Sequence, residues 1–221
     1  MQGKAPAIIG LLVLFVLCMV IGYFFARFTD GSAPTNTSTL DLTSQRRLVI
    51  IQVDDLTAAE PQLDVVWLLA VSFSSSPQLN FRIIYPAEKD GEILSHFGIS
   101  ANQQPDQDFL PGIQQTFNLA KISDYILFDR VALQTLSIWL GTGEVPLQGA
   151  NPGDYAIFHK ALIPYGCDNA QAITEKVPPL EWSKLIGAKH LRTSLSFNDL
   201  GLLWDALIKI IGQLKCEITL Y

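Results

Sequence analysis

Residues 50–71 read IIQVDDLTAAEPQLDVVWLLAV, and this stretch decides the fold. A first apolar run ends at the adjacent acids Asp54 and Asp55, and a second apolar run begins around Asp64. Runs this continuous are typical of strands that are buried on both faces of a sheet. The acids therefore stand at strand ends, where they are either the remains of a charged site or the acids of a solvated turn.

Further strand and helix patterns are mixed along the chain on both sides of this stretch. Pro164 is expected to end a helix that starts at Pro152, and Ser196 with Asp199 forms an approximate capping box before the last helix. The mixed order predicts a layered α/β/α domain with a central mixed sheet. The expected strands are 48–53, 63–73, 79–85, 125–128, 145–147 and 216–220, and the expected helices are 106–119, 131–140, 152–164, 171–176, 181–188 and 196–211.

The N-terminal region predicts a membrane anchor. Residues 5–26 contain no charge, and a helix of that length spans a hydrocarbon core of about 30 Å. The alternative is a cleaved signal peptide, but its apolar core is shorter and ends in small residues. We expect a cytoplasmic tail at 1–4, a transmembrane helix at 5–26, a Ser- and Thr-rich flexible linker at 27–45 and an extracytoplasmic domain at 46–221. This arrangement predicts a single-pass protein of the cell membrane.

The charge of the chain argues against a nucleic-acid partner. The net charge is −6, and all 21 acidic residues follow the predicted span. An acidic domain repels a phosphate backbone unless it carries a basic patch, and no basic run is longer than Arg46-Arg47.

Two cysteines lie beyond the predicted span. Cys167 and Cys216 could form a disulfide in an oxidising compartment, or they could be two buried free thiols. They have no CxxC spacing, which makes a zinc site a poor interpretation. Both alternatives stay open at this point.

Motifs for nucleophilic or metal catalysis are absent from the sequence. The chain has no G-x-S-x-G elbow, and His96, His159 and His190 show no metal-ligand spacing. Gly141-Thr142-Gly143 follows a helix instead of a strand, so a helix stop explains it better than a phosphate-binding loop. We therefore assign no catalytic residue.

Asp54 and Asp64 are the candidate ligand site. Ligands of layered α/β domains usually bind at strand ends, and two carboxylates there could hold one Mg²⁺. The competing interpretation is that Asp54 and Asp55 cap a turn and that Asp64 is hydrogen-bonded locally.

The order of these elements resembles that of the LytR-CpsA-Psr family of bacterial cell-envelope proteins. The resemblance covers about residues 46–212, and it places Asp54 and Asp64 at two acids of the family pattern. The segments that carry it are VIIQVDD at 49–55, QLDVVWLLAVS at 62–72, FRIIYPAEKD at 81–90, DYILFDRVALQTLSIWLGTGEVPL at 124–147 and HLRTSLSFNDLGLLWDAL at 190–207.

The resemblance implies a single-pass, N-in membrane protein with an external α/β domain. It also implies transfer of glycopolymers from a polyprenyl-pyrophosphate carrier to the cell wall, with magnesium, acids and a cluster of arginines. On this basis the partners would be the membrane and a polyprenyl-linked lipid or an envelope glycan.

The chain departs from the family pattern where arginines would clamp the pyrophosphate. Leu56, Gln62 and Ala87 stand at those positions, and 154–172 has only His159 and Lys160 as basic residues. Lysine does not replace the planar fork of arginine on a phosphate, and a diphosphate without cations loses most of its electrostatic stabilisation.

Three hypotheses follow from these departures. The first is a catalytically degenerate domain that binds an envelope lipid, a glycan or a partner protein. The second is an active phosphotransferase in which Arg82, Arg130 or Lys160 replaces the missing clamp. The third is an anchored structural or interaction domain without a small ligand. The candidate ligand-binding residues are Asp54, Asp64, Arg82 and Arg130, with Asp54 and Asp64 as the metal ligands.

Overall fold

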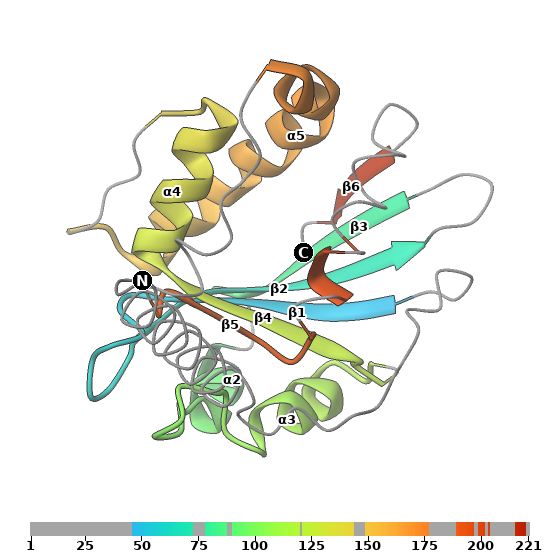
Figure 1. Cartoon of the computed structure of the whole chain (residues 1–221). Helices are drawn as coiled ribbons and strands as arrows, with labels where there is room; N and C mark the ends of the chain where they lie inside the picture. Colours follow the sequence, from blue (N-terminus) through green and yellow to red (C-terminus); the bar gives the residue numbers. More distant parts are fainter. Residues whose placement is uncertain are drawn as a thin grey trace, which may run out of the picture. The chain divides into compact units, whose positions relative to one another are not determined.

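The protein was examined as a computed structural model, which describes residues 46–72, 78–87, 90–119, 121–143, 149–176, 189–196, 199–201, 203 and 215–219. These residues form a six-stranded sheet with helices, in the strand order β5-β4-β1-β2-β3-β6 (Figure 1). The strands are β1 (Arg46–Val53), β2 (Leu63–Ser72), β3 (Gln78–Tyr85), β4 (Asp124–Asp129), β5 (Leu191–Thr193) and β6 (Lys215–Thr219). The helices are α2 (Asp90–His96), α3 (Phe109–Thr116), α4 (Arg130–Leu140) and α5 (Pro152–Lys176).

The sheet is mixed, as the sequence predicts. β1 pairs with β2 in antiparallel register and with β4 in parallel register. β2 and β3 form an antiparallel pair, β3 and β6 a parallel pair, and β4 and β5 an antiparallel pair. β1, β3, β4 and β6 therefore run in one direction, and the carboxyl ends of β1 and β4 lie side by side at one edge of the sheet.

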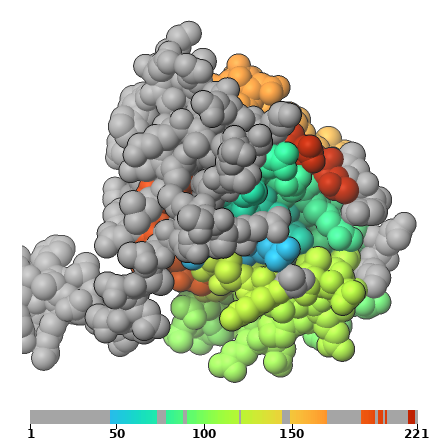
Figure 2. All heavy atoms as spheres, turned by 90° about the vertical axis from the view of Figure 1, so that its right-hand side faces the viewer, coloured from blue at the N-terminus to red at the C-terminus, as the bar shows by residue number. Residues whose placement is uncertain are grey.

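Each face of the sheet has its own core, which confirms the layered architecture. One core packs sheet residues such as Trp67 and Phe128 against Leu133 of α4 and Tyr155 of α5. The other core packs the opposite face against Ile93 of α2 and against α3. In Figure 1, α4 and α5 lie on one side of the sheet and α2 and α3 on the other. Figure 2 shows β1 in blue between α5 in orange and the yellow-green segment that contains α3.

A β-bulge interrupts the pairing of β1 with β2 where β2 begins. Gln52 is opposite Val65 and Val53 is opposite Leu63, so Asp64 is the extra residue on its strand. A bulge leaves one residue outside the ladder and re-aims its side chain. Leu63 packs in the α2/α3 core and Val65 in the α4/α5 core, while the hydrogen bonds of Asp64 are made with residues on the α4/α5 side.

The prediction that Pro164 ends a helix is wrong. α5 is one helix from Pro152 to Lys176 that contains Pro164, so the separate helix expected at 171–176 is its last part. Proline removes a backbone donor and disturbs a helix interior. Packing overrides this preference here, because Tyr155 and Ala156 are buried against the sheet before the proline and Cys167 is bonded to β6 after it.

Other elements differ from the sequence prediction in smaller ways. The sequence missed α2, in which only Ile93 is buried, and β5, which has three residues. It found the last strand, which the structure has as β6. The Ser196 half of the approximate capping box is confirmed, because Ser196 Oγ accepts from the Asp199 N–H at 3.1 Å; Ser196 Oγ also donates to Asp199 Oδ2 at 2.8 Å.

Several predictions lie outside the described residues. They are the cytoplasmic tail, the transmembrane helix at 5–26, the linker at 27–45, the strand at 145–147, the helix at 181–188 and most of the helix at 196–211. Among the residues that the structure describes, no helix is both long and apolar enough to span a bilayer.

Candidate functional site

Asp64 is buried in an ion pair with Arg130 at the carboxyl edge of the sheet. Arg130 is the first residue of α4, directly after β4, and its Nε donates to Asp64 Oδ2 at 2.7 Å. Its Nη2 donates to Asp64 Oδ1, also at 2.7 Å. The side chain of Asp64 is 2% exposed and that of Arg130 is 17% exposed. This is the bidentate geometry in which an arginine binds a carboxylate most strongly.

A buried polar chain continues from Asp64 into the core. Gln52 Nε2 donates to Asp64 Oδ2 at 3.0 Å, and Gln52 Oε1 lies 2.6 Å from His159 Nε2. A carboxylate can only accept, so Gln52 presents its amide nitrogen to Asp64 and its oxygen to the imidazole. Neutral His159 therefore carries its ring proton on Nε2, and this N–H donates a hydrogen bond to Gln52 Oε1.

The surroundings of His159 keep the imidazole neutral. It is buried on α5, and its ring lies parallel to those of Trp67 and Phe128 at centroid distances of 6.4 and 6.3 Å. Burial among apolar rings disfavours the charged form and lowers the pKa of His159 from 6.5 to about 4. His159 is thus uncharged at neutral pH.

Tyr155, one helical turn before His159, holds the other side of the guanidinium. The Arg130 Cζ atom lies 4.7 Å from the centroid of the Tyr155 ring, within cation–π range. The hydrogen bonds to Asp64 raise the pKa of Arg130, and burial raises the pKa of Tyr155 against the opposite effect of Arg130. Arg130 is therefore a fixed and permanently charged member of the site.

Asp54 and Asp55 shape the loop between β1 and β2. Asp54 Oδ1 accepts from the backbone N–H groups of Asp55 and Gln62, both at 2.7 Å. Asp55 Oδ1 accepts from the N–H and the hydroxyl of Thr57, and these bonds lower the pKa of Asp55. These contacts are those of the turn-capping interpretation. The turn adjoins the start of α4, because the Asp54 carbonyl oxygen lies 3.5 Å from the backbone nitrogen of Arg130.

Arg82 is not part of this group. It lies in the middle of β3 opposite Leu68, and its guanidinium carbon is 5.5 Å from the centroid of the Phe117 ring on the α2/α3 face. The structure thus brings the Asp64 and Arg130 side chains of the sequence-predicted set together, with Asp54 in the adjoining turn, and it places Arg82 elsewhere.

Sequence reasoning missed a second buried acid next to the site. Asp129, the last residue of β4, is fully buried, and its Oδ1 accepts from the Ala132 N–H at 3.0 Å as the N-cap of α4. Its Oδ2 lies 2.6 Å from His190 Nδ1. An aspartate directly before a helix is a capping signal that the sequence does contain. This cap fixes the start of α4 and with it the position of Arg130.

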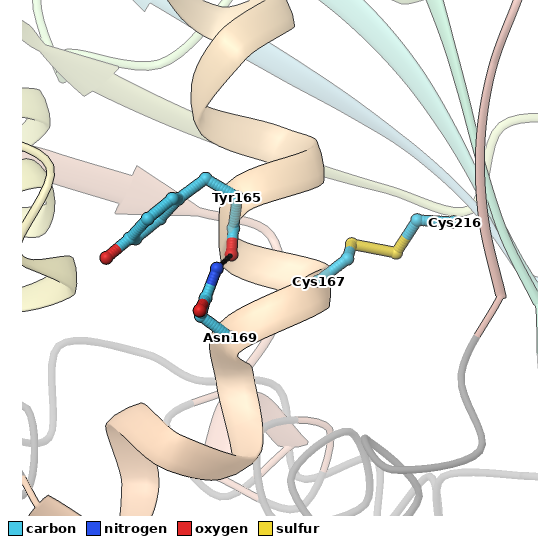
Figure 3. Close-up of a disulfide and its surroundings, with 4 residues drawn as sticks. All are labelled: Tyr165, Cys167, Asn169 and Cys216. Carbon is cyan, nitrogen blue, oxygen red and sulfur yellow. Dashed lines mark hydrogen bonds between the residues drawn. A yellow bond between two sulfur atoms is a disulfide. The ribbon is translucent and has the colours of Figure 1, made fainter.

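A disulfide lies away from the site, between α5 and β6. Cys167 and Cys216 are bonded, with their Cα atoms 6.3 Å apart, and Figure 3 shows Cys167 pointing from the helix toward the strand. Tyr165 and Asn169 point to the other side of α5, where the Asn169 side chain donates to the Tyr165 carbonyl at 3.0 Å. The disulfide joins the helix that carries His159 to an edge strand of the sheet.

The residues as arranged do not fit a magnesium ion. Asp64 already accepts three N–H bonds from Arg130 and Gln52, and a guanidinium charge lies against it. Mg²⁺ needs oxygen ligands at about 2.1 Å in a regular octahedron. Among the described parts of the chain, no group of three or more His, Cys, Asp or Glu residues could hold a metal.

The charges at the site also define what it can bind. Asp54 and Asp64 are acids, Arg130 is the cation that neutralises one of them, and His159 is neutral. Together these four side chains carry one net negative charge, and the cation among them is already paired with Asp64.

Comparisons with known proteins give structural neighbours alone. No protein-family model matches the chain, and no curated protein matches it. The chain is similar to Lin1025 from Listeria innocua, with 10% identity, coverage of 79% of this chain and 82% of that one, and a TM-score of 0.45. It is similar to the protein gbs0355 from Streptococcus agalactiae, with 11% identity, 80% and 77% coverage, and a TM-score of 0.48. It is also similar to TagT bound to LIIa-WTA, with 11% identity, 81% and 79% coverage, and a TM-score of 0.46.

Proposed function

We propose that this chain is a membrane-anchored, extracytoplasmic domain of the LytR-CpsA-Psr type that has lost transfer chemistry. Its remaining role is to bind an envelope lipid, an envelope glycan or a partner protein. The observation that carries the proposal is the closed ion pair of Asp64 with Arg130. The guanidinium that could have bound a phosphate is instead committed to an acid of the protein itself.

Electrostatics support the loss of catalysis. Cleavage of a diphosphate needs cations aimed at the oxygens on which charge develops. At this site Arg130 is bonded to Asp64 on both carboxylate oxygens, and His159 is neutral. A diphosphate at this edge of the sheet would therefore meet a cation whose charge is already balanced by a buried acid, with two of its five N–H donors engaged.

The disulfide supports the proposed compartment. Structural disulfides persist in oxidising spaces and are rare in the cytosol. The Cys167–Cys216 bond joins α5 to β6, so the folded domain is consistent with export. The predicted span at 5–26 would supply the anchor on this side of the membrane.

The test is a transfer assay on the full-length chain in detergent micelles. The protein is incubated with a polyprenyl-pyrophosphate-linked sugar, a glycan acceptor and Mg²⁺, and the released polyprenyl monophosphate is measured by mass spectrometry. We expect no release above a protein-free control, with an active family member as positive control. Turnover that depends on Asp64 would establish the active phosphotransferase instead.

The binding role is tested on the same preparation. Lipids and glycans that copurify with the gently solubilised protein are identified by mass spectrometry and compared with an unrelated single-pass protein. We expect enrichment of an envelope lipid or glycan. If neither is enriched and a crosslinked protein partner is found, the interaction-domain alternative replaces ligand binding.

A further inference from the structure

Arg130 occupies the place at Asp64 that a divalent cation would need. Its two N–H groups bond both carboxylate oxygens at 2.7 Å, and Gln52 supplies a third donor at 3.0 Å. A carboxylate has about four lone-pair sites, so three of them are already used. A metal that approached the remaining site would also meet the positive charge of the guanidinium.

The guanidinium is held from several directions, so it is a fixed group of the site. Its backbone starts α4 behind the cap made by Asp129, and the Arg130 N–H lies 3.5 Å from the Asp54 carbonyl oxygen. Its Cζ atom lies over the Tyr155 ring, 4.7 Å from the ring centroid. An arginine that is pre-ordered by stacking and by bidentate bonds loses little further freedom on pairing.

Removal of that guanidinium would leave Asp64 without its cation. Of the contacts described above, Asp64 would keep only the neutral donor of Gln52. A buried carboxylate without a partner is strongly unfavourable, and a divalent cation that keeps several of its waters could supply the missing charge.

We propose that Arg130 is a built-in cation that replaces a divalent metal beside Asp64. The charge of Asp64 is therefore balanced without metal, and removal of the guanidinium lets a divalent cation bind at Asp64. This inference does not depend on the loss of catalysis, because a site without metal could be active or inactive. It follows from the contacts of one side chain.

The test uses Mn²⁺ as the probe, with its binding to the full-length protein in micelles followed by electron paramagnetic resonance. We expect the wild type and Asp64→Asn to bind equal amounts of Mn²⁺, because Asp64 contributes nothing to metal binding while Arg130 is present. We expect Arg130→Met to bind Mn²⁺ at least about tenfold more tightly than the wild type. The gain should disappear in Arg130→Met combined with Asp64→Asn, and Arg130→Lys, which keeps the charge, should show none.

Each outcome decides the inference. Mn²⁺ binding by the wild type that is lost in Asp64→Asn overturns it, and so does a folded Arg130→Met that binds no more than the wild type. If Arg130→Met folds only when Mg²⁺ is added, as seen by near-ultraviolet circular dichroism, the inference is supported. If that variant does not fold at all, the comparison of the wild type with Asp64→Asn decides alone. Turnover in the presence of a chelator would refute the proposed function and leave this inference standing.

Discussion

The neutral, buried His159 makes the stability of the domain depend on pH. The pKa of this imidazole is about 4 in the folded protein, against 6.5 for an unperturbed histidine. The unfolded chain therefore takes up a proton before the folded chain does. The stability that His159 provides is complete above about pH 6.5 and is lost progressively as the pH falls toward about 4.

The size of this effect follows from the two pKa values. The gap between 6.5 and about 4 corresponds to about 3 kcal/mol when it is fully expressed. About 1 kcal/mol should be lost between about pH 7 and about pH 5.5, and about 2.5 kcal/mol by about pH 4.5. The molecular cause is the cost of charging a ring that lies among Trp67, Phe128 and Phe158.

The assay is denaturant unfolding at a series of pH values, followed by tryptophan fluorescence. The matched control is His159→Gln, whose amide can still donate to Gln52 Oε1 and does not titrate. Carboxylates titrate in both proteins, so the difference between the two curves isolates the histidine. If the wild type and His159→Gln lose stability in parallel from pH 7 to 4.5, the imidazole is not held neutral by burial and the reasoning is refuted.

Three further predictions concern the charged pair, the disulfide and the cap of α4. Arg130→Met should lower the free energy of unfolding by about 3 kcal/mol in denaturant titrations, because Asp64 stays behind as a buried charge. Adding Asp64→Asn should recover most of that loss, and no recovery would contradict the pairing. Cys216→Ala should cost about 4 kcal/mol from the 49-residue separation that the disulfide closes, and an unchanged wild-type midpoint under reductant would argue against this. Asp129→Ala should lower the free energy of unfolding by about 2 kcal/mol, because the helix cap and the contact with His190 are both lost. Asp129→Asn keeps the cap acceptor and should lower it less, and equal losses would exclude the capping explanation.

The sheet was predictable because its strands carry their own signal. The apolar runs that contain Val49, Val66 and Ile84 are continuous, and these residues are fully buried in the structure. Continuous runs report burial on both faces without any knowledge of partners. α2 and β5 carry no such signal, because each buries one residue, and Pro164 gives a strong local signal that packing overrides.

The sequence indicated the acids and Arg130 as candidate residues, but not the contacts that join them. Asp54 and Asp64 stand next to apolar runs, but Gln52 and His159 are 107 positions apart in the chain and meet only through packing of α5 on the sheet. A sequence motif records only whether arginines stand at fixed positions near the acids. It cannot show that Arg130, 66 positions after Asp64, reaches the same carboxylate from the end of β4.

The bulge at Asp64 explains why the acid and its cation belong together. The extra residue in β2 makes its contacts on the α4/α5 side of the sheet, where a carboxylate that is 2% exposed requires compensation. Arg130 supplies the charge, and Gln52 with neutral His159 supplies the remaining polar contacts without adding another charge. An acid at the position of a ligand-binding residue can therefore be required by the fold alone. Loss of binding in an Asp64 variant counts as evidence for a ligand site only when Arg130→Met/Asp64→Asn, which lacks the buried charge, is shown to be folded and has lost the same binding.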